Sequence, residues 1–144
     1  MQIDPARGAT LIELTLVLAI SSILCIISIL HAGSFIDRME VRGAVTEIES
    51  LFSVARHAAI ARGSQSVLNI DASSGLLTVS AGGAAVVSRN VGAVHGVTIS
   101  TARSSMTYSP IGVGYGAANF SLIVSRRAAS DTIIISRLGR VRHQ

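Results

Sequence analysis

The chain of 144 residues is 49% hydrophobic and 14% charged, with a formal net charge of +4. Because a long apolar segment takes up part of this length, the remainder has room for one small domain and excludes a second. The single cysteine, Cys25, excludes a disulfide within the chain, so packing alone must hold the fold. All twelve basic residues are arginine, which indicates a compositional bias.

A long apolar segment follows a short polar start. Residues 14–36 contain no Asp, Glu, Lys or Arg. As a helix this segment spans roughly 35 Å, longer than the roughly 30 Å hydrocarbon core of a bilayer, so we expect one membrane pass. Glu13 lies at the mouth of the segment, where a carboxylate is costly unless a cation neutralises it. The simplest candidate for that cation is an amino terminus newly created by cleavage of the chain.

After residue 36 the apolar positions change from a continuous run to a stripe with the period of a helix. No proline interrupts positions 9–62, so one helix can run through them until Gly63 supplies a C-cap residue. We expect residues 9–36 to lie in the membrane and residues 37–62 to form an amphipathic half that packs on a head. The stripe comprises Val41, Ala44, Val45, Ile48, Leu51, Phe52, Ala55, Ala58 and Ala59.

Beyond Gly63 the sequence consists of short β-branched runs separated by turn residues. About seven strands at this spacing, after one long helix, predict an α+β fold in which residues 63–144 form small antiparallel sheets packed on the helix. The first two runs read as a hairpin around residues 71–75. The expected strands are 67–70, 76–80, 84–89, 94–100, 105–109, 120–125 and 132–136.

The start of the chain resembles the class III signal of type IV pilins and pseudopilins, which are filament subunits. The resemblance rests on Arg7-Gly8-Ala9-Thr10-Leu11-Ile12-Glu13-Leu14 followed by an apolar helix. It implies that residues 1–8 are a leader, that a prepilin peptidase cuts after Gly8, and that Ala9 becomes an N-methylated terminus. It also implies that Glu13 meets the terminal amine of a neighbouring subunit, which makes it an assembly residue.

The same resemblance implies a single pass through the inner membrane, with the head in the periplasm and the cleaved leader in the cytoplasm. The expected partners are the prepilin peptidase, other pilin or pseudopilin subunits and the membrane itself. Two positions depart from the usual pattern: Ala9 stands where a Phe is usual, and the apolar half lacks the proline that major pilins often carry. The second departure favours a minor subunit or a pseudopilin.

The end of the chain resembles the GspH/FimT family of pseudopilins and minor pilins. The resemblance rests on Tyr108-Ser109-Pro110-Ile111-Gly112, on residues 120–124 and on residues 133–142. Within it, Gly139-Arg140-Val141-Arg142 is similar to the Gly-Arg-x-Arg motif that contributes to DNA binding in DNA-uptake minor pilins.

Five arginines against Asp131 give the last 19 residues a charge of +4, so the preceding residues sum to zero. If residues 139–142 are extended, Arg140 and Arg142 share one face, and Gly139 lets the backbone approach a phosphate closely. Arg126, Arg127 and Arg137 are candidates to extend this DNA-binding patch. The alternative is a solvated cationic terminus that discourages edge pairing of the last strand.

Other classes of function find little support in the sequence. A secretory signal cut near residues 31–33 is disfavoured because Glu13 falls inside its apolar region. The four histidines show no ligand spacing, so we expect no metal and no cofactor. No nucleophile elbow is present, and we expect no enzyme. Two hypotheses remain: a structural pseudopilin of type II secretion, or a minor type IV pilin whose basic terminus captures DNA.

Overall fold

The computed structural model describes residues 10–115, 119–136, 138 and 140–143, and for residues 29–31 it describes the backbone alone. The chain divides into two compact units, Met1–Phe35 and Ile36–Gln144. Helix α1, Leu11–Arg62, contributes its first part to one unit and the rest to the other. All the strands belong to the second unit, which we call the head.

In the first unit the described part of α1 is long and apolar enough to cross a membrane, judged by length and composition alone. Its most apolar window of 18 residues has a mean hydropathy of 2.5, and none of that window is buried. The hydroxyl groups of Thr15, Ser22 and Ser28 donate to backbone carbonyls of the preceding turn at 2.7–2.9 Å. These polar side chains are therefore satisfied inside the helix, as an apolar solvent requires.

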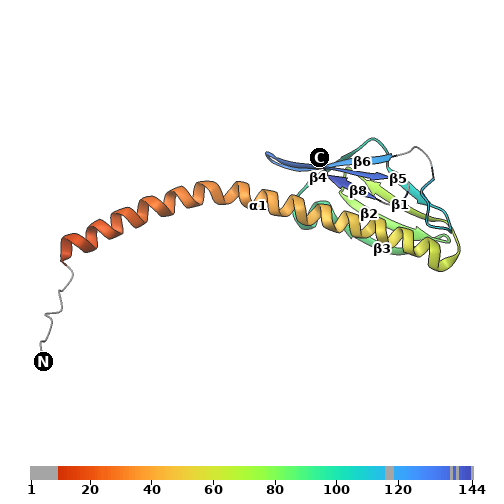
Figure 1. Ribbon diagram of the computed structural model, residues 1–144, viewed down its shortest axis with the longest axis horizontal. Coiled ribbons are helices and arrows are strands. Elements are labelled where there is room, and N and C mark those ends of the chain that lie inside the picture. Colours follow the sequence, from red (N-terminus) through yellow and green to blue (C-terminus); the bar gives the residue numbers. More distant parts are fainter. Residues whose placement is uncertain (1–9, 116–118, 137, 139, 144) are drawn as a thin grey trace, which may run out of the picture. The chain divides into compact units, whose positions relative to one another are not determined.

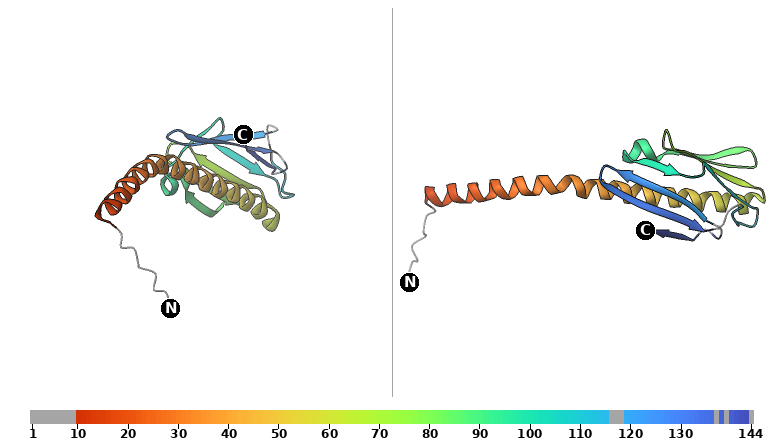
Figure 2. Two further views of the ribbon diagram at one scale, coloured as in Figure 1. Left: turned by 60° about the vertical axis from the view of Figure 1, so that its left-hand side comes forward. Right: turned by 90° about the horizontal axis from the view of Figure 1, so that it is seen from above.

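The head contains two four-stranded antiparallel sheets, with strand orders β3-β2-β1-β5 and β4-β6-β7-β8. Viewed from above, the green strands and the blue strands lie on either side of the line of α1 (Figure 2). Figure 1 labels the elements. Their bounds are β1 Ser66–Asp71, β2 Leu76–Ala81, β3 Ala84–Asn90, α2 Val91–His95, β4 Thr98–Thr101, β5 Ser105–Tyr108, β6 Asn119–Arg126, β7 Ala129–Ser136 and β8 Val141–His143.

One core joins the amphipathic part of α1 to the inner faces of both sheets. Every residue of the expected helical stripe is buried except Ala58, which is half-buried. Alternate residues of the strands complete this core, among them Leu68, Leu77, Phe120 and Ile133. The α+β class and the packing of the helix on antiparallel sheets are thus confirmed.

Two local features match the sequence expectations closely. The helix ends at Arg62, and Gly63 adopts φ 57° while the N–H groups of Gly63 and Ser64 donate to the carbonyls of Ile60 and Ala59. This is a Schellman C-cap, which needs the left-handed conformation that glycine adopts at little cost. The expected first hairpin is also present, with β1 and β2 in antiparallel register from Ser66↔Ala81 to Asp71↔Leu76.

The expectation of a strand over residues 94–100 is wrong at its start. Residues Val91–His95 form helix α2, and β4 begins at Thr98. The side chain of Asn90 accepts a hydrogen bond from Ala93 N at 2.9 Å and caps this helix, whose apolar valines imitate a strand pattern. The structure also adds β8, so its described part has eight strands where seven were expected.

Candidate functional site

The described chain begins at the start of α1, where Thr10 and Glu13 form the pattern of a capping box. The backbone N–H of Glu13 faces the carbonyl oxygen of Thr10 at 3.1 Å and its Oγ1 at 3.3 Å. Gly8 and Ala9, the expected processing residues, lie outside the described residues. The local sequence therefore starts a helix just before the carboxylate.

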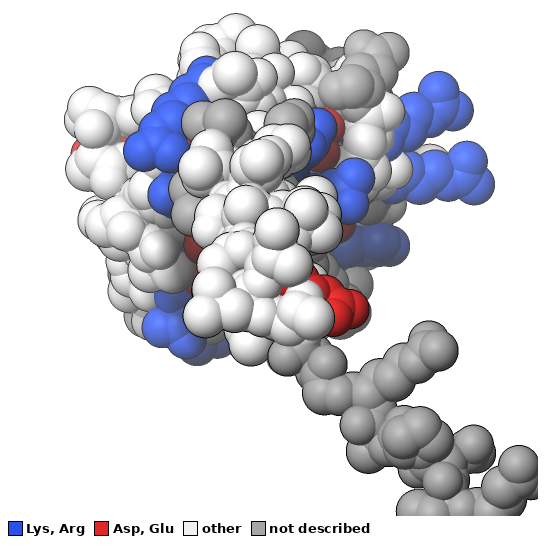
Figure 3. Space-filling model, turned by 90° about the vertical axis from the view of Figure 1, so that its left-hand side faces the viewer, with Lys and Arg blue, Asp and Glu red and all other residues white. Residues whose placement is uncertain are grey.

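Glu13 is exposed, and no described residue forms an ion pair with its carboxylate. It is also the only Asp, Glu, Lys or Arg between residues 10 and 36. Figure 3 looks toward this end of the helix, whose atoms facing the viewer are mostly white. If this part of the helix lies in hydrocarbon, a carboxylate at this position is costly without a cationic partner.

The second candidate site is a groove of about 400 Å³ on the head, which we call the arginine groove. In β8 the register Ile135↔Val141 and Ile134↔Arg142 places Arg142 on the outer face of the sheet, because Ile135 is buried. Arg140 lines the same groove, as the alternation in sequence predicts. The groove is lined by Asn119, Ile134, Ser136, Leu138, Arg140 and Arg142.

The charge balance around the arginine groove is one-sided. Among the described residues, none makes a hydrogen bond or an ion pair with the guanidinium group of Arg140 or Arg142, and no carboxylate lines the groove. The described carboxylates of the head are engaged elsewhere: Asp37 with Arg126 and Arg127, Glu40 and Glu47 with His95, Glu49 and Asp131 with His143, and Asp71 with Ser73 and Ser74.

The other arginines of the expected DNA-binding set do not join this groove in the described structure. Arg126 ends β6 and Arg127 lies in the turn between β6 and β7, where both guanidinium groups contact Asp37 of α1. The backbone of Arg140 instead contacts Ser136, at the other end of β7. Arg137 and Gly139 lie outside the described residues.

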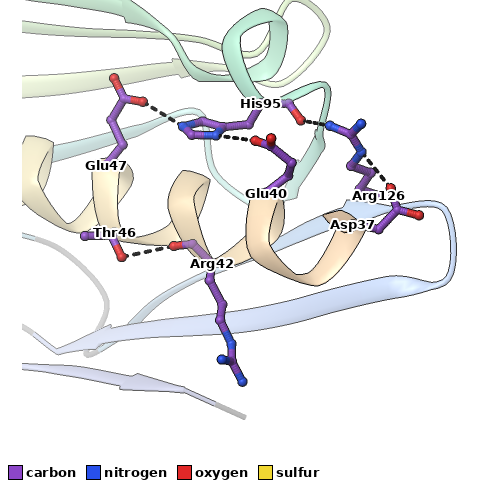
Figure 4. A network of polar contacts seen from close by, with 7 residues as sticks. All are labelled: Asp37, Glu40, Arg42, Thr46, Glu47, His95 and Arg126. Carbon is purple, nitrogen blue, oxygen red and sulfur yellow. Dashed lines mark hydrogen bonds and ion pairs between the residues drawn. The ribbon is translucent and has the colours of Figure 1, made fainter. Parts of the chain in front are cut away.

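Sequence reasoning missed a polar network that surrounds His95, shown in Figure 4. The ring of His95 lies between two carboxylates of α1, with Nδ1 at 2.9 Å from Glu40 Oε2 and Nε2 at 3.1 Å from Glu47 Oε2. Arg126 donates through Nη1 to the carbonyl of His95 and through Nε to Asp37 Oδ1. The sequence hints at this network only through Glu40 and Glu47, which lie on either side of Gly43. This spacing is not part of the metal and catalytic motifs.

Comparison with solved structures identifies the fold. FimU, a type IV minor pilin of Pseudomonas aeruginosa PAO1, matches with a TM-score of 0.62 and 16% identity over 76% of this chain and 92% of FimU. A second crystal form of FimU gives 0.59, 14%, 72% and 92%. EpsH, a minor pseudopilin of the type 2 secretion system of Vibrio cholerae, gives 0.55 and 12% identity over 73% of this chain and 96% of EpsH.

These similarities establish that the chain has the fold of a minor pilin or minor pseudopilin. No protein-family model and no curated protein gives a significant match to the sequence.

Proposed function

We propose that the chain is a non-enzymatic, pilin-like subunit of the GspH/FimT kind, assembled into a filament of a type IV pilus or a type II secretion system. The observation that carries the proposal is Glu13, which has no ion-pair partner among the described residues and lies near the start of a segment, residues 10–36, that is otherwise uncharged, on a chain with the fold of FimU and EpsH. In a plain membrane anchor that carboxylate would have no function, since it only raises the free energy of insertion into the membrane.

The proposal assigns a role to each segment. Residues 1–8 are a cytoplasmic leader that prepilin peptidase removes after Gly8, which leaves Ala9 as an N-methylated terminus. Residues 9–36 cross the inner membrane once, residues 37–62 are the amphipathic half of the helix, and residues 63–144 complete a periplasmic head. The capping of α1 by Thr10 supports this division, because the new terminus then stands directly before the helix.

Glu13 acts in this proposal through charge cancellation between subunits. A carboxylate and an amine are each costly in hydrocarbon, and the cost falls when the two meet. A neighbouring subunit brings its terminal amine to Glu13 only when the helices stack in register. Assembly in the correct register is therefore favoured over any other arrangement in the membrane.

Changing Glu13 tests the assembly role directly. Glu13→Leu should leave cleavage after Gly8 intact and abolish incorporation into filaments, measured by mass spectrometry of the terminus and by blotting of sheared filaments. Thr15→Leu is the matched control, because Thr15 is also polar and exposed but bonds only within its own helix. Normal incorporation of Glu13→Leu contradicts the assembly role.

Processing is tested separately on the wild-type chain and on a variant of the cleavage position. Mass spectrometry of protein from the native host should find a methylated Ala9 terminus, and Gly8→Leu should accumulate as an uncleaved precursor. A wild-type terminus at Met1 or Gln2 would overturn the leader assignment.

The arginine groove favours a second candidate function, the capture of DNA by a minor pilin. Arg140 and Arg142 line one groove, carry no described counter-charge, and the described lining of that groove holds no carboxylate. Two phosphate contacts give weak, sequence-independent binding, with a slope of log K against log salt of about −2. This candidate does not exclude the filament role, since both require the same assembled subunit.

DNA binding is tested with the full chain in detergent micelles and a fluorescent duplex at low salt. Arg140→Ala with Arg142→Ala should abolish the anisotropy change. Arg89→Ala, an exposed residue of β3 on the other sheet, is the control for loss of charge alone and should retain most of the binding. Absence of wild-type binding at low salt excludes this function, while equal loss in the control reduces it to a net-charge effect.

A further inference from the structure

His95 has an unusual position for a histidine outside a metal or catalytic site. Its side chain is only 19% exposed, and each ring nitrogen lies within hydrogen-bond distance of a different carboxylate, those of Glu40 and Glu47. The two glutamates lie seven residues apart on α1, so they project from one side of the helix about two turns from each other. The imidazole bridges them.

Two glycines leave room for this network, one beside the imidazole and one beside Arg126. A Cβ on Gly43, which lies between the glutamates on α1, would stand 3.0 Å from His95 Cε1. On the other side Gly96 ends α2 in the left-handed conformation, and a Cβ there would stand 2.9 Å from Nη1 of Arg126. The ring therefore packs closely against α1 at Gly43, and a side chain at either glycine would displace a member of the network.

The hydrogen-bond chemistry of imidazole ties this arrangement to protonation. A carboxylate only accepts hydrogen bonds, so both contacts are satisfied when both ring nitrogens carry a proton. A neutral ring has one N–H and one lone pair, and the lone pair would then face a carboxylate oxygen at about 3 Å. Deprotonation of His95 thus removes one charge-assisted bond and leaves two nearby carboxylates without a shared cation.

The other charged groups around His95 do not replace this cation. From β6, the guanidinium of Arg126 donates to the carbonyl of His95 and is paired with Asp37, which Arg127 also contacts. Arg42 on α1 points away from the imidazole in Figure 4. Asp71 stands at the turn between β1 and β2, which contacts α2, and its carboxylate accepts hydrogen bonds from the serine hydroxyls of that turn. The two glutamates therefore depend on His95.

We propose that His95 is a protonation-dependent clamp that fastens α2, and through Arg126 the end of β6, to the first turns of α1 in the head. Both contacts require a proton on each ring nitrogen, so the clamp is closed while the imidazole carries two protons and loosens when the ring loses one of them. The only ligand of the clamp is the proton. The clamp gives the head a pH-sensitive segment at residues 37–47, directly after the apolar stretch, whether or not the filament proposal holds.

Hydrogen exchange tests the clamp on the full chain in detergent micelles. Protection is measured at pH 5.5 and pH 8.5, each relative to the unstructured chain at the same pH, so that intrinsic exchange rates cancel. Amides of residues 37–47 and 91–96 should lose about tenfold in protection at pH 8.5, as expected for the loss of one charge-assisted bond. Equal protection at both values overturns the proposal.

Three variants identify the group responsible. His95→Gln should remove the pH dependence of both segments. His143→Gln should retain it, although His143 also lies between two carboxylates, those of Glu49 and Asp131. His57→Gln should likewise retain it, because within the described part of the chain the ring of His57 forms hydrogen bonds to Ser53 alone and forms no ion pair with a carboxylate. Loss of the pH dependence in either control, with retention in His95→Gln, contradicts the assignment.

A fourth variant covers the case in which His95→Gln does not fold. Glu40→Gln combined with Glu47→Gln keeps the shape of the network but removes the charges that demand an imidazolium, since an amide oxygen or amide N–H can face either form of the ring. The clamp should then hold equally at both pH values. If this double variant keeps the wild-type pH dependence, another group is the sensor and the proposal fails.

Discussion

Arg126 and Asp37 lie 89 residues apart in the sequence, and Nε of the arginine donates to Oδ1 of the aspartate at 2.9 Å. Asp37 is the first charged residue after the apolar stretch, and its side chain is only 8% exposed. The contact therefore joins the beginning of the amphipathic half of α1 to the end of β6. Because both guanidinium groups of the arginine pair at the β6–β7 turn contact Asp37, this pair stabilises the fold and does not line the arginine groove.

Removal of Arg126 should destabilise the head more than removal of its neighbour Arg127. Arg126→Ala leaves a nearly buried carboxylate with one weak partner and should lower the free energy of unfolding by about 2 kcal/mol. The side chain of Arg127 is 74% exposed, so Arg127→Ala should cost less than about 1 kcal/mol. Urea unfolding of the two variants measures both values, and equal losses would contradict this division.

Hydrophobic periodicity made the long helix and most of the strands predictable from the sequence. The stripe on residues 41–59 specifies which face of α1 is buried, and turn residues separate the strands. Helix α2 was not predictable in this way. Its valines fit a strand pattern, and it is held by the Asn90 cap and by the close approach of Gly92 to Gly75, a contact between residues far apart in sequence.

The candidate sites were predictable where they depend on local spacing and not where they depend on tertiary contacts. Alternation along residues 140–142 predicts that Arg140 and Arg142 share one face, and both line the arginine groove. Nothing local indicates that Arg126 belongs to Asp37, since the folding of β6 against α1 creates that pair. The same holds for His95, whose two partners lie 55 and 48 residues away.

Gly43 should show opposite effects with and without the histidine it accommodates. In the wild-type background Gly43→Ala places Cβ 3.0 Å from His95 Cε1, so the ring must move and the head should lose about 1 kcal/mol. In a His95→Ala background the clash is absent, and the higher helix propensity of alanine should stabilise the head by about 0.5–1 kcal/mol. A double-mutant cycle from thermal unfolding measures this reversal. The same sign in both backgrounds contradicts the role of Gly43.

Asp71 should make the head sensitive to strong acid. Hydrogen bonds from the hydroxyl groups of Ser73 and Ser74 lower the pKa of this aspartate to about 2 from the ordinary 3.8. Because the pKa is lower in the folded state, the unfolded chain binds the proton more readily, and the stabilisation is present above about pH 4. It is lost as the pH falls through 2. The difference in stability between wild type and Asp71→Asn should therefore shrink from pH 5 to pH 2, whereas a constant difference would contradict the assignment.

The glycine under α2 can be tested against a second glycine in a comparable backbone conformation. Gly75 has φ 67°, and a Cβ there would stand 2.5 Å from the Cα of Gly92, so Gly75→Ala adds a backbone clash to a strained conformation. Gly83 has φ 82° with nothing within 4 Å of its Cβ position. Gly83→Ala should lower the free energy of unfolding by about 1 kcal/mol from strain alone, and Gly75→Ala by more than about 2 kcal/mol.

Because the clash must push α2 away from the hairpin turn, Gly75→Ala should also reduce the hydrogen-exchange protection of residues 91–96 at pH 5.5, while Gly83→Ala leaves it unchanged. Equal costs for the two variants, with unchanged protection in both, would show that the contact with Gly92 does not hold α2 in place.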